Sequence, residues 1–295
     1  MTSRSSSCHS DNMYGNRHLL VATDLTDRSQ RAFERAIQLK SELGAAVTLL
    51  HALEPGLFPA IGEERYADAE GLLRNLITEL PEDKRAGVTS EIRVGEPFSS
   101  IIDEADKHDA ELIIVGQPAK GGLKEFFIGT TTERVVLHSD LPVLVVNEPV
   151  RGAYSHVMVA MDLSEGAIRA LETAYRIAPD AEFLIVHAWH VPSITFDAND
   201  AAERVAVRKS KRVRERVDRR FKEFLSDLAP HARTPRFEFL EGSPHVAIRS
   251  QMAVFNPDLL AMGTHARSAM KSAMIGSLSR EFLAEGRCDM LVAHA

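Results

Sequence analysis

Cysteine is scarce in this chain of 295 residues, which has only Cys8 and Cys288. Two cysteines cannot build the disulfide framework of a small secreted domain, and this fits a reducing compartment. No apolar run approaches the roughly 18 residues that a membrane helix needs. The polar start of the chain, MTSRSSSCHSDNMYGNR, lacks the apolar centre of a secretory signal. The sequence therefore predicts a disordered tail over residues 1–17 and a cytoplasmic protein.

Catalytic motifs are also missing. The chain has no Gly-x4-Gly-Lys-(Ser/Thr) phosphate loop. Neither paired carboxylates nor a Ser/His/Asp set can be assembled from the spacing of the residues. We therefore predict that the protein is not an enzyme, although slow ATP hydrolysis without a nameable general base stays open.

Charge and histidine spacing limit the partners. A net charge of -7 argues against a general nucleic-acid binder. The exception is the basic run Arg204–Lys222, for which we favour the solvated face of a helix over a surface for an acidic partner. His187 and His190 would point to opposite faces of a strand, which is poor geometry for a metal site. We predict no metal site.

What the chain has in quantity is an alternation of apolar runs and amphipathic segments, within a composition of 44% hydrophobic and 26% charged residues. The expected strands are 18–23, 46–51, 88–94, 111–115 and 143–147, then 156–161, 182–188, 237–240, 258–262 and 290–294. The expected helices are 27–43, 66–80, 98–108, 165–178, 199–228 and 245–255, with two more starting at Thr130 and Ser277. Residues 54–62, rich in Pro and Gly, read as a loop. Such alternation predicts two doubly wound parallel-sheet α/β domains.

One loop occurs twice in the sequence. Gly116–Thr130 reads GQPAKGGLKEFFIGT and Gly263–Ser277 reads GTHARSAMKSAMIGS, and they lie 147 positions apart. Each follows a buried apolar strand and precedes a helix, an arrangement that presents backbone N–H groups to a phosphate. Thr130 and Glu133 also have the spacing of a capping box, a structural role that competes with a phosphate role for the Thr130 hydroxyl.

An aspartate follows the first strand of each half. Asp24 and Asp162 should lie at the carboxyl edge of the sheet, beside the repeated loop. A turn or helix-cap role is the alternative to a ligand role. The neighbouring loop favours the ligand role.

These features resemble the universal stress protein family. The resemblance rests on Gly-x2-Gly-x9-Gly-(Ser/Thr) after the fourth strand, Asp after the first, and flanking text such as LLVATDLTDRSQRAFERAIQL and VMVAMDLSEGAIRALETA. It covers nearly everything from His18 to Ala295 and implies two tandem Rossmann-like domains of the adenine nucleotide alpha hydrolase type. We assign half one to residues 18–148, a linker to 149–155 and half two to 156–295. Related ATP pyrophosphatases would carry Ser-Gly-Gly after the first strand, and this chain does not.

The resemblance implies an ATP site in which the aspartate lies near adenosine and the glycine loop holds the phosphates. ATP is a possible cofactor and not a required one, and no metal is expected beyond the Mg²⁺ that accompanies a nucleotide. In half two the implied residues are Asp162, Gly263, Ala266, Arg267, Gly276, Ser277 and Ser279. In half one they are Asp24, Gly116, Ala119, Gly129, Thr130 and Thr132.

Both loops depart from the family pattern, because Ala119 and Ala266 replace the second glycine. A side chain there is strained if the position needs a positive φ. Half one departs further, since Pro118 removes a loop N–H. Arg267 offers half two a fixed positive charge, and a solvated loop cation is its alternative reading. We therefore expect the better nucleotide site in half two.

Family members pair through their last strands. By resemblance, Val143–Val146 and Met290–Ala293 should join the two halves as an internal pseudo-dimer, and association of two chains into a homodimer stays open. The predicted function is a cytoplasmic stress-response protein that binds ATP and signals through conformation. The alternative is a family member that does not bind ATP and acts as an interaction scaffold or a carrier of another small ligand.

Overall fold

Ten strands form one sheet in the computed structural model, which describes residues 17–55, 59–117, 130–189, 215, 219, 234–264 and 276–295. The strand order is β3-β2-β1-β4-β5-β10-β9-β6-β7-β8. Each half contributes the order 3-2-1-4-5 of a doubly wound fold. The predicted fold class is confirmed. The predicted tail (as far as residue 16) and, apart from residues 215 and 219, the predicted helix 199–228 lie outside the described residues.

Half one begins with β1 (His18–Thr23), α1 (Asp27–Leu43) and β2 (Ala46–Leu53). It continues with α2 (Pro59–Thr78), α3 (Glu82–Arg85), β3 (Val88–Val94) and α4 (Pro97–Lys107). It ends with β4 (Leu112–Gly116), α5 (Thr131–His138) and β5 (Val143–Val146). Within half one, each described strand pair is parallel.

Half two repeats this order with β6 (His156–Ala160), α6 (Glu165–Ile177), β7 (Glu182–Trp189) and β8 (Arg236–Glu241). It continues with α8 (Pro244–Phe255), β9 (Leu259–Gly263), α9 (Ser277–Glu285) and β10 (Asp289–Ala293). Its described strand pairs are parallel as well. The predicted strands match these to within one or two residues, and so do the predicted helices that fall in the described ranges, except at α2. The short helix α3 was not predicted.

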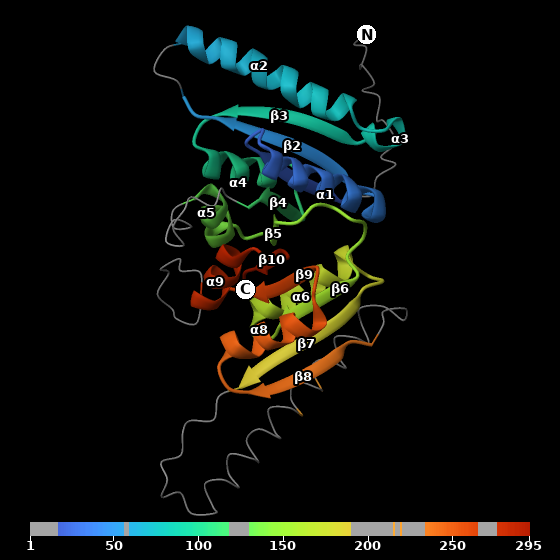
Figure 1. The fold of residues 1–295 in the computed structure, drawn as a ribbon. Helices are drawn as coiled ribbons and strands as arrows, with labels where there is room; N and C mark the ends of the chain where they lie inside the picture. The colour runs from blue at the N-terminus through green and yellow to red at the C-terminus, as the bar shows by residue number, and fades with distance from the viewer. Residues whose placement is uncertain are drawn as a thin grey trace, which may run out of the picture.

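The start of α2 was predicted wrongly. We expected a loop over residues 54–62 because Pro and Gly are enriched there, but α2 already begins at Pro59. Proline is tolerated in the first helical turn, where its missing N–H would have no intrahelical partner. The helix lies along β3 at the outer edge of half one (Figure 1).

Two hydrophobic cores lie on opposite faces of the sheet. One core packs α1 and α6 against the sheet, and the other packs α4, α5, α8 and α9 against the opposite face. Each core contains residues of both halves, so burial is continuous across the middle of the molecule. Central strands such as Leu112–Gly116 are almost wholly buried, as expected for parallel strands covered on both faces.

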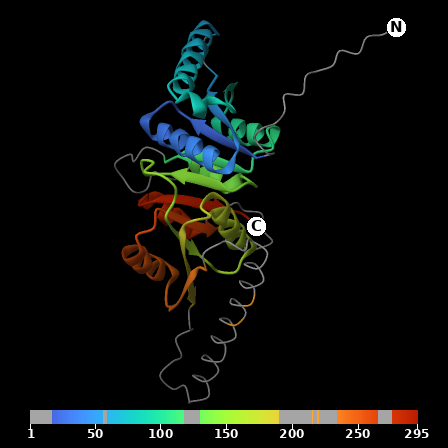
Figure 2. The same cartoon turned by 90° about the vertical axis from the view of Figure 1, so that its right-hand side faces the viewer.

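The two halves meet where β5 pairs with β10 in antiparallel register. Leu144 lies opposite Leu291, with Val145 opposite Met290 and Val143 opposite Val292. Figures 1 and 2 show half one above and half two below, joined along these two strands. The predicted internal pseudo-dimer through the last strands is thereby confirmed.

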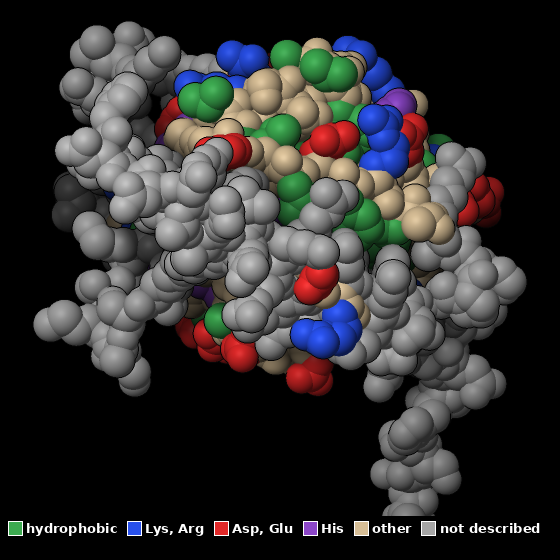
Figure 3. Space-filling model, turned by 90° about the horizontal axis from the view of Figure 1, so that it is seen from below, with side chains coloured by type: hydrophobic (Ala, Val, Ile, Leu, Met, Phe, Trp, Pro, Cys, Tyr) green, Lys and Arg blue, Asp and Glu red, His purple; other side chains and the backbone are tan. Residues whose placement is uncertain are grey.

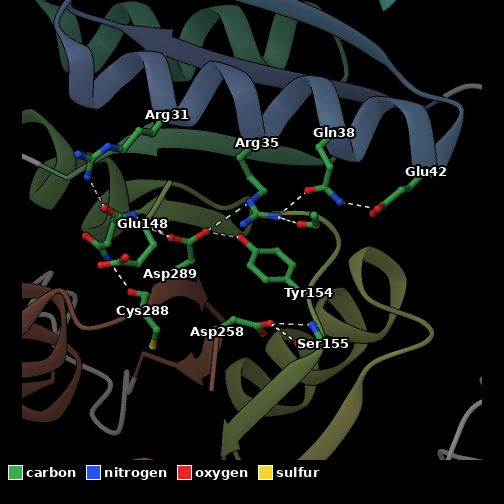
Figure 4. A network of polar contacts seen from close by, with 12 residues as sticks. Arg31, Arg35, Gln38, Glu42, Glu148, Tyr154, Ser155, Asp258, Cys288 and Asp289 are labelled. Atoms are coloured by element: carbon green, nitrogen blue, oxygen red, sulfur yellow. Dashed lines mark hydrogen bonds and ion pairs between the residues drawn. The ribbon is translucent and has the colours of Figure 1, made fainter. Parts of the chain in front are cut away.

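A buried polar network ties the linker to both halves (Figure 4). One Asp289 oxygen accepts the N–H groups of Asn147 (2.8 Å) and Glu148 (3.1 Å). The other accepts the Tyr154 hydroxyl at 2.7 Å and lies 3.4 Å from Arg35 Nε. The Arg35 guanidinium lies 4.0 Å from the centre of the Tyr154 ring. The network therefore joins α1, the linker and β10.

The described surface carries charges of both signs. In the view from below, acidic and basic side chains lie interspersed with apolar and neutral ones (Figure 3). None of the helices in the described ranges combines the length and apolar character needed to cross a membrane.

Candidate functional site

The same turn follows the first strand of both halves. Asp24 Oδ1 accepts the Thr26 N–H at 3.1 Å and the Thr26 hydroxyl at 2.6 Å. Asp162 Oδ1 accepts the Ser164 N–H at 2.9 Å and the Ser164 hydroxyl at 2.6 Å. One oxygen of each aspartate thus organises the turn into the next helix. The turn role that competed with ligand binding is observed, and the ligand role remains a prediction.

A strained leucine sits inside each of these turns. Leu25 has φ 62° and Leu163 has φ 67°, a left-handed conformation that a leucine rarely adopts. Such strain is concentrated at functional sites, because the surrounding structure must hold it in place. Sequence reasoning missed this feature, since leucine is not a residue that signals positive φ.

Asp24 is held in its charged form. Burial opposes ionisation, but hydrogen bonds from Ser29 and Thr26 outweigh it and lower the pKa of this carboxyl. An ionised carboxylate at a sheet edge can accept hydrogen bonds from ribose hydroxyls.

The first glycine of each motif is required by packing. A Cβ on Gly263 would lie 2.3 Å from the backbone nitrogen of Ala167, and a Cβ on Gly116 would lie 2.8 Å from the Arg28 carbonyl oxygen. These contacts place the start of α6 against β9 and the start of α1 against β4. Gly116 and Gly263 therefore allow helix and strand to approach at the cleft.

The helix that follows the loop begins differently in the two halves. In half one the Thr130 hydroxyl accepts the Glu133 N–H at 3.2 Å, and the Thr132 hydroxyl donates to the Gly116 carbonyl at 3.1 Å. Both hydroxyls therefore serve the fold. This confirms the predicted structural role of Thr130 as a helix cap.

In half two, α9 starts after Gly276, which contributes no side-chain cap. Ser277 is exposed and Ser279 is buried at the same helix start. Gly276 has φ −53°, and a Cβ added there would meet no atom of the described residues within 4 Å. It is the N-cap of α9, a position at which glycine is among the favoured residues.

A cavity of about 330 Å³ opens at the carboxyl edge of half one. Its lining includes Asp24, Ser29, Gln117, Thr130 and Thr132, along with apolar side chains from β1, β2 and α4. The structure thus brings the described half-one site residues Asp24, Gly116, Thr130 and Thr132 together around one cavity.

A histidine at the end of the second strand recurs in both halves. His51 Nδ1 lies 2.8 Å from the Thr23 carbonyl oxygen, and His187 Nδ1 lies 2.7 Å from that of Met161. Donation to a carbonyl requires the proton on Nδ1, and in a neutral ring Nε2 is then an acceptor. His51 lines the half-one cavity. Sequence reasoning weighed His187 only as a metal ligand, although its match with His51 in the aligned second strands was a readable signal.

Four predicted site residues lie outside the described part of the chain: Ala119, Gly129, Ala266 and Arg267. Among the residues that are described, no group of three or more His, Cys, Asp or Glu side chains could hold a metal ion. Cys288 is buried, and burial raises the pKa of its thiol to about 12, as suits a packing residue.

Comparisons with known proteins agree with this architecture. The family model described as universal stress protein family matches residues 15–147 and again 153–294. A universal stress protein of Methanocaldococcus jannaschii is 27% identical over 148 residues, covering 47% of this chain and 85% of the relative. One of Mycobacterium bovis is 20% identical over 224 residues, covering 72% of this chain and 70% of the relative.

A solved structure shares the whole arrangement. The crystal structure of a universal stress protein from Archaeoglobus fulgidus matches with a TM-score of 0.67 at 20% identity, covering 95% of this chain and 99% of that one. At 20% sequence identity this match shows that the two proteins share a fold. Together with the double match to the family model, it identifies this chain as a member of the universal stress protein family with two such domains in tandem.

Proposed function

We propose that this protein is a cytoplasmic stress-response protein that binds an adenine nucleotide, ATP in particular, through half two and signals through conformation. The observation that carries the proposal is Gly276. Gly276 is the N-cap of α9, and no atom of the described residues lies within 4 Å of its Cβ position. A phosphate could approach this helix start, because helix starts attract anions and no side chain at position 276 obstructs them.

The surrounding residues support this placement. Gly263 and Asp162 stand at the carboxyl ends of β9 and β6, which pair with each other in the sheet. Ser277, exposed at the first position of α9, offers a hydroxyl beside the helix N–H groups. Arg267, from the loop of half two, would supply positive charge to the phosphates.

The proposal is tested with purified full-length protein. Denaturation should release an adenine nucleotide, or added ATP should raise the melting temperature in a concentration-dependent way. Absence of both would contradict nucleotide binding.

Ala266 gives a second test of the same site. If the methyl group at this position hinders phosphate approach, Ala266→Gly should strengthen ATP binding. Thermal stabilisation by ATP, compared between the two proteins, measures this. Unchanged or weaker ATP binding by Ala266→Gly would mean that the Ala266 methyl group does not hinder the approach of the phosphates.

Half one supports a second candidate function, the carriage of a small ligand other than a nucleotide. Its cavity of about 330 Å³ is formed, but the hydroxyls of Thr130 and Thr132 are engaged by the fold. Pro118 additionally removes a loop N–H that could meet a phosphate. A ligand that stabilises the chain without competing with ATP would support this function.

A further inference from the structure

The junction between the halves has a pseudo-two-fold axis that places equivalent residues opposite each other. Positions 147 apart are equivalent in the repeated loops, and Leu144 and Leu291 are one such pair. These two leucines face each other in the antiparallel pairing of β5 with β10. Any residue close to this axis therefore faces its own counterpart from the other half.

Glu133 and Arg280 are also equivalent positions, and they face each other. Arg280 Nε lies 3.1 Å from Glu133 Oε1, joining α9 to α5. The Glu133 side chain is only 2% exposed, and that of Arg280 is 36% exposed. Equivalent positions of the two halves thus carry opposite charges. This is possible only because the two halves differ in sequence.

Pairing of like halves would reverse this complementarity. Two copies of half one would bring a buried Glu133 against another Glu133, and two copies of half two would bring Arg280 against Arg280. A buried carboxylate that loses the opposite charge facing it is destabilised, and a like charge in its place adds repulsion. We propose that Glu133 and Arg280 make this junction selective for unlike halves, so that half one accepts half two and rejects a second copy of itself.

Asp289 strengthens the same selectivity. It is 1% exposed and contacts Arg35 and Tyr154, and its counterpart in half one is Pro142. Arg35 aligns with Thr173 in half two when the two aspartates of the first-strand turns are matched. Two copies of half two would therefore bury Asp289 opposite Thr173, without a guanidinium to compensate its charge.

Reversing the charge of Glu133 or of Arg280 in the full-length chain creates the contact that two identical halves would make at this position. Arg280→Glu creates the Glu–Glu contact of a half-one pair, and Glu133→Arg creates the Arg–Arg contact of a half-two pair. Arg280→Gln removes the ion pair without adding repulsion. We expect Arg280→Glu to lower the melting temperature by about 5 to 10 °C and by more than Arg280→Gln does.

The double reversal Glu133→Arg with Arg280→Glu restores opposite charges and should recover most of the lost melting temperature. The exposed pair Glu182 and Arg236, with side chains 42% and 61% exposed, provides the control, and its reversal should shift the melting temperature little. If a single reversal does not fold, folding of the double variant still supports the proposal. The proposal is overturned if Arg280→Glu is no worse than Arg280→Gln, or if the double variant is as unstable as the single ones or also fails to fold.

Discussion

The two glycines that recur in the motif have different surroundings. A Cβ on Gly263 would meet the backbone of α6, whereas a Cβ on Gly276 would meet no atom of the described residues within 4 Å. We expect Gly263→Ala to lower the free energy of unfolding by about 1 to 3 kcal/mol, because a Cβ at 2.3 Å from a backbone nitrogen forces strand and helix apart. Urea unfolding measures this loss.

Gly276→Ala is the matched control for that substitution. It adds the same methyl group where no atom of the described residues lies within 4 Å, so the expected loss is only that of replacing an N-cap glycine by alanine, about 0.5 kcal/mol. Equal losses in the two variants would refute the separation between a packing glycine and a ligand glycine.

At the scale of elements, α4 is fastened to β3 by a buried carboxylate. Hydrogen bonding from Arg93, together with a smaller contribution from Lys107, outweighs desolvation and lowers the pKa of Glu104 to about 2. A lowered folded-state pKa stabilises the protein above the ordinary value of 4.5, and this contribution disappears as the pH falls from 4.5 toward 2.

Glu104→Gln should therefore cost about 1 to 2 kcal/mol at pH 7, a figure reduced for the partial exposure of Arg93 and Lys107. The difference between variant and wild type should shrink as the pH falls below 4.5. Unfolding curves between pH 7 and pH 3 measure this, and a difference independent of pH would contradict the assigned cause.

The regular elements could be predicted from sequence because their signals are local. Buried apolar runs gave the central strands, and Gly44 ends α1 in the left-handed conformation expected of a helix stop. The prediction of where α2 starts was wrong because Pro59 and Gly62 are typical loop residues that the first turn of a helix also tolerates. The positive φ of Leu25 and Leu163 occurs inside the turns that Asp24 and Asp162 organise, and a leucine is not a sequence signal for this conformation.

At the scale of the whole molecule, the halves are held by more than strand pairing. The Tyr154 hydroxyl donates to Asp289 at 2.7 Å inside the linker network. Burial raises the pKa of Asp289, and hydrogen bonds from Tyr154 and two backbone N–H groups oppose that rise. Removing one of these donors should leave the carboxylate less well compensated.

We expect Tyr154→Phe to lower the free energy of unfolding by about 1 to 3 kcal/mol at pH 7. The folded state holds the Asp289 proton more tightly than the unfolded chain does, so its contribution to stability falls as the pH rises above 3.8. The loss in Tyr154→Phe should accordingly be greater at pH 7 than at pH 4. A loss that is the same at both pH values would refute this assignment.

Sequence could predict that the last strands join the halves, because Val143–Val146 and the Met290–Ala293 part of β10 are apolar and follow the family pattern. It could not predict which polar residues secure the junction. Glu133 and Arg280 are far apart in sequence, and only the register of β5 with β10 brings them together. The gathering of Asp24, Gly116, Thr130 and Thr132 followed from topology, whereas the use of both threonine hydroxyls by the fold depends on atomic contacts.

The most direct test of nucleotide binding through half two is calorimetric titration of ATP into three full-length proteins. These are the wild type, Gly276→Val and the equivalent half-one variant Gly129→Val. We predict that the wild type binds ATP, that Gly276→Val weakens binding by about tenfold or more because a branched side chain blocks the start of α9, and that Gly129→Val binds as the wild type does. Unchanged affinity in Gly276→Val, or a loss confined to Gly129→Val, would contradict the account.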